Sequence, residues 1–297
     1  MRTELLLAAA LLLGTPGVGH ARLRVAASTN DLASIAASVG GEQIEAFAIA
    51  RPNNDVHRVE VLPSYMVKVS KADLYLKVGL GLDAWADAII AGSRNQRVRI
   101  VDCSKGIDPL ERPTDKVTAA MGDVHPNGNP HYWLDPRNGA QVARTIAEAL
   151  GQADPAHAGD YHERAEALAK ECEAARERGR RLAAGLPVRE IVTYHRSWPY
   201  LAAAFGLTIA ATVEPVPGIP PTARHLAELL AIIRSRRIPV LLQEPYFSGD
   251  AGKFLARESG LRVVVASASC EKPEAGSYLA HLADVLQQIG EAEAATP

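Results

Sequence analysis

The chain has 297 residues, of which 47% are hydrophobic and 22% charged, and its formal net charge is −2. This composition is that of a globular protein and excludes a disordered chain, and the length corresponds to roughly two domains. The near-neutral charge and the aromatic content of 5% exclude the basic, aromatic-rich surface typical of nucleic-acid binding. We therefore expect no nucleic acid among its partners.

The first 21 residues predict a signal peptide. Arg2 precedes an uninterrupted apolar run at residues 5–13, and Gly19-His20-Ala21 forms a small-x-Ala cleavage pattern. The apolar run is too short to cross a membrane as a helix, which takes about 20 residues. We expect an exported, soluble, periplasmic protein that is cleaved after about Ala21.

Short β-rich runs alternate with helical segments along residues 22–136. The expected strands are residues 23–28, 43–50, 73–78 and 97–102, and the expected helices are residues 30–39, 63–72 and 82–91. Strands that alternate with helices favour a parallel sheet covered on both faces. We interpret residues 22–136 as an N-terminal α/β lobe.

Residues 137–185 predict connecting helices. The pattern is rich in Ala, Glu and Arg and is broken at Asp154-Pro155. Asp154 suits the N-cap, and Pro155 the first position, of a helix that would run to residue 184 and measure about 45 Å. Because that length exceeds one globular layer, we expect one long, rigid helix that spans both lobes. A coiled-coil stem is not favoured, because the apolar residues are mostly Ala.

The alternation of strands and helices resumes in residues 186–297, which we interpret as a C-terminal α/β lobe. The expected strands are residues 190–195, 207–213, 239–244 and 261–266, and the expected helices are residues 198–205, 221–236, 249–259 and 276–292. The predicted fold class is therefore α/β, with two parallel-sheet lobes joined by one long helix.

Three histidines lie at comparable positions in this plan. His57 lies in the loop after the second strand, His131 lies just before the connecting helices, and His195 ends the first strand of the second lobe. Ligands of open α/β sheets bind outside the carboxyl ends of the strands, so these side chains can converge on a cleft between the lobes. Neutral imidazole is a common ligand of zinc and other late first-row metals. Because no HxxxH or CxxC spacing occurs, the metal site is a hypothesis from position alone.

Several passages resemble, in order, the solute-binding proteins of zinc and manganese ABC uptake transporters, in particular their zinc-binding type. The passages include Asp55-Val-His57, Asn129-Pro-His-Tyr-Trp-Leu-Asp-Pro136, Tyr194-His195 and Gln243-Glu244-Pro. Together the matches cover nearly the whole chain after the signal peptide. The resemblance implies two lobes joined by a long rigid helix, with the metal in the cleft between them. The first three metal positions of that family fall on His57, His131 and His195.

The identity of the fourth ligand is open. Where the resemblance implies an Asp after the last strand, this chain has Ser267-Ala-Ser-Cys-Glu271. The candidates are Glu214, Glu244, Cys270, Glu271 and water. We expect Glu214, because its proline-rich loop is long enough to close over the cleft, whereas Glu244 could instead brace a histidine. His125, six residues before His131, is expected as an auxiliary capture ligand.

Three imidazoles and one oxygen favour Zn²⁺, because manganese prefers more oxygen ligands. The sequence thus predicts a protein without enzymatic activity that captures Zn²⁺ in the periplasm and delivers it to an ABC permease in the inner membrane. We expect a monomer, with a periplasmic metallochaperone as a further candidate partner. The alternatives are a zinc-dependent hydrolase, since three histidines and a water also make a catalytic zinc site, and manganese in place of zinc.

The chain has three cysteines, Cys103, Cys172 and Cys270. In an exported protein two of them could pair, and a bridge between Cys103 and Cys270 is one option. Cys172 lies in a helical pattern and is expected as a small buried side chain. The sequence does not decide the pairing.

Overall fold

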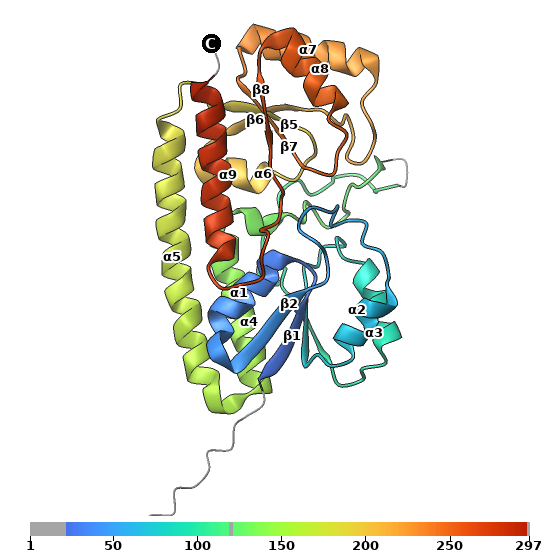
Figure 1. Ribbon diagram of the computed structural model, residues 1–297, viewed down its shortest axis with the longest axis vertical. Coiled ribbons are helices and arrows are strands. Elements are labelled where there is room, and N and C mark those ends of the chain that lie inside the picture. Colours follow the sequence, from blue (N-terminus) through green and yellow to red (C-terminus); the bar gives the residue numbers. More distant parts are fainter. Residues whose placement is uncertain (1–21, 119–120, 296–297) are drawn as a thin grey trace, which may run out of the picture.

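The structure is a computed structural model that describes residues 22–118 and 121–295 (Figure 1). The predicted signal peptide, residues 1–21, lies outside these described residues. The strands of the first sheet are β1 (Leu23–Ala27), β2 (Ile44–Ala48), β3 (Leu74–Lys77) and β4 (Arg99–Asp102). The strands of the second sheet are β5 (Glu190–Thr193), β6 (Thr208–Thr212), β7 (Val240–Gln243) and β8 (Arg262–Val265).

The two sheets have the same topology. Their strand orders are β2-β1-β3-β4 and β6-β5-β7-β8, and every neighbouring pair is parallel. Each observed strand lies within an expected one, so the predicted α/β class with two parallel-sheet lobes is confirmed. In a parallel sheet the carboxyl ends of the strands lie at one edge, and this arrangement places the loops that follow them together.

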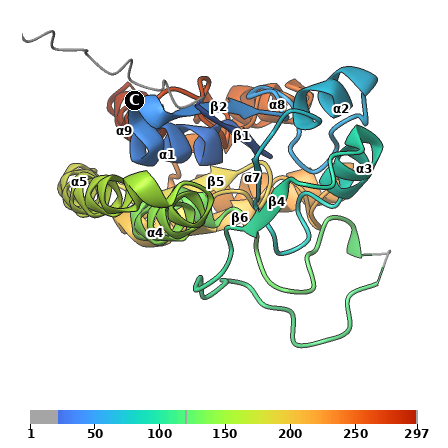
Figure 2. The ribbon, with the colours of Figure 1, turned by 90° about the horizontal axis from the view of Figure 1, so that it is seen from below.

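Helices cover both faces of each sheet (Figures 1 and 2). The helices before the second sheet are α1 (Asn30–Gly40), α2 (Pro63–Val69), α3 (Trp85–Ser93), α4 (Pro136–Ala153) and α5 (Ala158–Ala184). The later helices are α6 (Pro199–Phe205), α7 (Ala223–Arg236), α8 (Asp250–Ser259) and α9 (Ser277–Ala294). Helices α1 and α5 contact each other and both α4 and α9, so these four helices pack together on one side of the molecule.

The long connecting helix is present as α5, with 27 residues. It contacts α1 and α4 beside the first sheet and α6 and α9 beside the second. The predicted break is confirmed, since α4 ends at Ala153 and a 3₁₀ turn, Pro155–His157, precedes α5. The helix begins later than predicted because the Asp154 carboxylate lies 2.7 Å from His157 Nδ1 and accepts a hydrogen bond from the Tyr161 hydroxyl.

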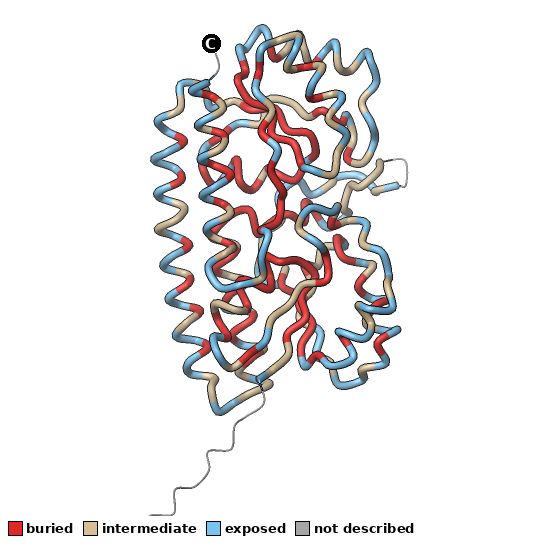
Figure 3. The backbone as a smooth tube through the Cα atoms, viewed as in Figure 1, coloured by how far each residue is buried: buried red, intermediate tan, exposed pale blue. Residues whose placement is uncertain are grey.

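One hydrophobic core extends through both lobes. Figure 3 shows that buried residues follow the strands of both sheets and the segments between them, and they belong to one cluster. This core includes Leu32 of α1, Leu242 of β7 and Leu286 of α9. Two smaller clusters fill the opposite faces, one under α2 and α3 and one under α7 and α8. The shared core fixes how the loops of the two lobes face each other.

The chain returns from the second sheet to the first lobe before its last helix. We call residues 266–276, between β8 and α9, the return segment. The Trp133 indole donates a hydrogen bond to the Ala268 carbonyl (2.8 Å), and Asn30 Nδ2 donates one to the Cys270 carbonyl (3.0 Å). The Ser34 hydroxyl donates to the Glu274 carbonyl (2.7 Å). The return segment therefore ties the end of the chain to α1.

Among the described residues, every helix is too short or too polar to cross a membrane. Cys103, Cys172 and Cys270 are all buried and unbridged. The pairing of Cys103 with Cys270 that the sequence allowed is therefore not formed.

Candidate metal centre

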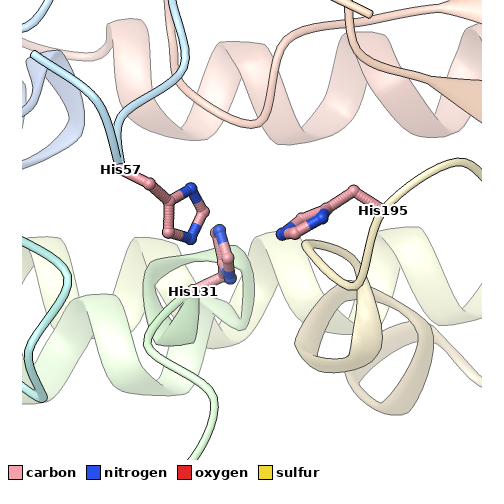
Figure 4. Close-up of side chains that lie close together, drawn as sticks. All are labelled: His57, His131 and His195. Atoms are coloured by element: carbon pink, nitrogen blue, oxygen red, sulfur yellow. The ribbon is translucent and has the colours of Figure 1, made fainter. Parts of the chain in front are cut away.

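The structure brings together the three histidines expected from the sequence (Figure 4). His57 follows β2, His131 directly precedes a 3₁₀ turn, Tyr132–Leu134, and His195 lies two residues beyond β5. Their ligand atoms all lie within 4.8 Å of one another, and no other such group of His, Cys, Asp or Glu is found in residues 22–118 and 121–295. The three rings thus converge from loops of both lobes.

Two of these histidines are held by the same local arrangement. Asp55 Oδ1 accepts a hydrogen bond from the His57 backbone N–H (2.9 Å) and lies 2.8 Å from His57 Nδ1. Asn129 Oδ1 accepts one from the His131 backbone N–H (3.0 Å) and lies 3.0 Å from His131 Nδ1. Because each oxygen is an acceptor, the proton of each neutral ring belongs on Nδ1 and the lone pair on Nε2.

His195 is held by a carboxylate from another loop. Glu214 Oε2 lies 2.6 Å from His195 Nδ1 and also accepts a hydrogen bond from the Gly218 backbone N–H (2.9 Å). Glu214 is buried, and it does not belong to the group of side chains whose ligand atoms lie within 4.8 Å of one another. The residue expected as fourth ligand thus contacts the outer nitrogen of a central ring.

Nε2 of His57 and Nε2 of His131 are buried and have no hydrogen-bond partner. Burying a polar atom without a partner costs free energy, so such atoms usually mark a bound group or a functional role. Histidines that bind metals almost always donate the other ring N–H to a carboxylate or carbonyl oxygen. The braced Nδ1 atoms and the unpartnered Nε2 atoms together fit a metal cation.

The protein environment shifts the pKa values of His131 and His195 in opposite directions. Burial, with the nearby rings of His57, His195 and His125, lowers the pKa of His131 well below its usual value. Burial also acts to lower the pKa of His195, but the hydrogen bond that its ring donates to Glu214 and the charges of Glu244 and Glu214 outweigh it, so this pKa is raised. His131 is therefore held neutral, whereas His195 has the greater affinity for a proton.

Asp55 keeps its negative charge in spite of its position. Burial alone would raise the pKa of Asp55, but the hydrogen bonds and the charge interaction with His57 outweigh it and lower the pKa. An ionised Asp55 strengthens the lone pair on the far nitrogen of His57, which favours binding of a cation there.

His125 stacks on His57, with the ring centroids 5.3 Å apart and an interplanar angle of 27°. Its Nε2 atom is buried without a partner, and burial with the charge of His57 lowers the pKa of His125 to about 4. The expected auxiliary ligand thus lies beside the cluster as a neutral ring.

Glu244, the alternative candidate, follows β7 and is 0% exposed. Burial raises the pKa of Glu244, although the charge of His195 and hydrogen bonds from the Ser197 hydroxyl and the Trp198 indole oppose this. The other two candidates lie in the return segment: the carbonyls of Cys270 and Glu271 accept hydrogen bonds from Asn30.

The cluster can be reached from two sides. One pocket is lined by His125, His131, His195, Glu111 and Arg196, among others. A second pocket is lined by His57, His195, Tyr246 and Phe247, among others. Since His195 lines both pockets, the central rings lie between two openings.

Asp55 and Asn129, which hold two of the rings, were not among the site residues predicted from the sequence. The available signal was the shared spacing, an oxygen-bearing side chain two residues before each histidine. The spacing alone does not show that one oxygen can bond both the backbone and the ring, because that depends on the conformation of the turn.

Comparisons with known proteins agree with this geometry. The family model of the periplasmic zinc-uptake complex component A matches residues 25–292. The chain is 30% identical over 263 residues to a putative metal-binding protein of Treponema pallidum, covering 86% of this chain and 83% of that protein. It is 28% identical over 289 residues to the iron-binding protein YfeA of Yersinia pestis, covering 93% and 88%.

Among solved structures, the crystal structure of ZnuA superposes with a TM-score of 0.78 at 26% identity, covering 92% of this chain and 99% of that one. The family consists of metal-binding transport proteins, so the zinc hydrolase considered from the sequence is set aside. The chain belongs to the family of the periplasmic zinc-uptake complex component A, the metal-binding components of ABC transporters.

Proposed function

We propose that this protein captures Zn²⁺ in the periplasm with His57, His131 and His195 and delivers it to an ABC permease in the inner membrane. The observation that carries the proposal is the convergence of three rings, each with Nδ1 close to an oxygen acceptor. Three neutral imidazoles suit zinc better than manganese, which prefers oxygen ligands. The protein acts as a monomer, and a periplasmic metallochaperone is a further candidate source of the ion.

A water molecule is proposed in the fourth position. Glu214 Oε2 is already bonded to His195 and Gly218, so its carboxylate serves to orient the ring. His125 is proposed as the auxiliary ligand that receives the ion in the pocket beside His131 and passes it inward. Its neutral ring and unpartnered Nε2 atom support this role.

The test is a Zn²⁺ titration in competition with a chelator, using the variants His57→Ala, His131→Ala and His195→Ala. Each change should weaken binding by more than the roughly 10–100-fold that loss of a bracing partner costs. The matched control is His162→Ala, since His162 is exposed on α5; this variant should bind as the unaltered protein does. A central histidine whose removal leaves affinity and stoichiometry unchanged is not a ligand.

The identity of the metal needs a separate measurement. Affinities for divalent ions follow a general order that favours zinc over manganese and iron at most sites, so affinity alone does not identify the physiological ion. The metal content of the protein isolated from the periplasm of its own host should be zinc. Manganese or iron at one ion per chain would contradict the proposal.

A further inference from the structure

The carboxylate of Glu244 is buried beside the metal centre. Strands β5 and β7 are parallel neighbours in which Thr193 pairs with Leu242. His195 and Glu244 each lie two residues after this pair, just beyond the carboxyl ends of the two strands. The register therefore places Glu244 next to the histidine that Glu214 braces.

Two neutral donors lie beside the Glu244 carboxylate. The Ser197 hydroxyl and the Trp198 indole N–H are buried there and, with the charge of His195, favour its ionised form against the effect of burial. In contrast, Asp55 and Glu214 each bond a histidine ring. A buried carboxylate that no cation pairs with is unfavourable, and a cation placed close to it offsets that cost.

A bound ion would place uncompensated positive charge in this buried site. Three neutral imidazoles supply lone pairs but no charge, so a divalent cation among them would add two positive charges to a buried site. Glu244 lies outside the group whose ligand atoms are within 4.8 Å of one another, so it does not coordinate the ion together with the three rings. Its charge nevertheless acts at His195, where it favours the positive form.

We propose that Glu244 is the counter-charge of the metal centre: without coordinating the ion, it sets the preference of the three-histidine site for divalent over monovalent cations. This rests on the proposed function, since it requires that the three histidines bind a cation. The energy between two charges is proportional to each charge, so removing Glu244 must cost a divalent ion twice the free energy that it costs a monovalent ion at the same place.

The experiment compares Zn²⁺ and Ag⁺ binding in chloride-free buffer. Both ions have a filled d shell and accept imidazole nitrogen, but their charges differ. In Glu244→Gln, which keeps the shape and removes the charge, the loss of Zn²⁺ affinity should be the square of the loss of Ag⁺ affinity. A Zn²⁺ loss of about 100-fold would thus accompany an Ag⁺ loss of about 10-fold. Glu244→Asp, which keeps the charge, should retain most of the preference for Zn²⁺.

The matched control is Glu228→Gln, which removes one exposed charge from α7 of the same lobe and should change neither affinity. The metal-free Glu244→Gln variant should melt at or above the temperature of the unaltered protein, because burial disfavours the charge that it loses. Equal losses for the two ions, no loss, or a metal-free variant that fails to fold would overturn the proposal. If the unaltered protein itself bound no Zn²⁺, the proposed function would fail instead.

Discussion

Two of the central histidines, His131 and His195, differ in how firmly they hold a proton. A ring binds a metal only through a deprotonated nitrogen, so protons and metal compete. His131, whose pKa is lowered by burial, offers no competition near neutral pH. His195, whose pKa is raised by Glu214 and Glu244 against the effect of burial, keeps a proton to higher pH. Of these two rings, His195 is therefore the one that is protonated first as the pH falls.

We expect the affinity for Zn²⁺ to fall as the pH decreases, beginning above the ordinary histidine value of about 6.5. The sign follows from the raised pKa of His195: above this pKa the ring is free for the metal, and below it a proton must leave first. Dissociation constants measured between pH 8 and 5.5 should rise about tenfold per unit once this proton competes. Glu214→Gln should move the onset to lower pH. Equal dissociation constants at pH 7.5 and pH 5 would contradict this expectation.

At the scale of residues, the sequence predicted which histidines converge but not how each is held. Position after a strand for His57 and His195, and before the connecting helices for His131, was enough to predict one cleft, because topology fixes that edge of each sheet. The contact between His195 and Glu214 spans 19 residues and depends on the path of a loop. The path of that loop leaves no periodic pattern of hydrophobic residues in the sequence from which it could be predicted.

At the scale of elements, the packing of α5 depends on a glycine. A Cβ atom at Gly179 would lie 2.4 Å from Phe205 Cε1 and 2.8 Å from Leu286 Cδ1. The absence of a side chain there lets α6 and α9 approach the long helix closely. At Gly159, near the start of the same helix, a Cβ atom would meet nothing within 4 Å.

These two glycines predict opposite effects of the same substitution. Gly179→Ala should lower the free energy of unfolding by about 1–3 kcal/mol, because the methyl group overfills a packed interface. Gly159→Ala should raise it by up to about 1 kcal/mol, because alanine favours the helix and meets no neighbour. Urea titrations of the two variants check both signs. A Gly179→Ala variant as stable as the unaltered protein would show that the interface relaxes freely.

The order and type of the elements could be predicted because hydrophobic periodicity is local, but some boundaries could not. The helix expected from residue 82 begins at Trp85. The preceding residues form a turn in which Leu80 has φ 54° and the Asp83 carboxylate accepts hydrogen bonds from the backbone N–H groups of Val78 and Gly79. The Asp83 carboxylate thus bonds the backbone just after β3, and α3 begins two residues after Asp83.

At the scale of the whole molecule, the last helix completes the first lobe. The Tyr278 backbone N–H donates a hydrogen bond to Ser34 Oγ (3.0 Å), and the Tyr278 hydroxyl donates one to the Trp133 carbonyl (2.6 Å). These contacts join residues 244 and 145 positions apart. The sequence presents the lobes as consecutive units, so its local patterns could not predict this closure.

We therefore expect the two lobes to unfold together. Tyr278→Phe leaves the buried Trp133 carbonyl without this donor and should lower the free energy of unfolding by about 1–3 kcal/mol. Because the core is shared, hydrogen exchange should report the same decrease for amides of β1 in the first sheet and β7 in the second. A decrease confined to β1 would show that the lobes unfold independently.

The attachment of the return segment to α1 has a consequence for how the protein folds during translation. A ribosome releases Ser34 long before Tyr278, so for most of translation one side of the first helix has nothing to cover it. The nascent chain must wait for its final helix before its first lobe can close.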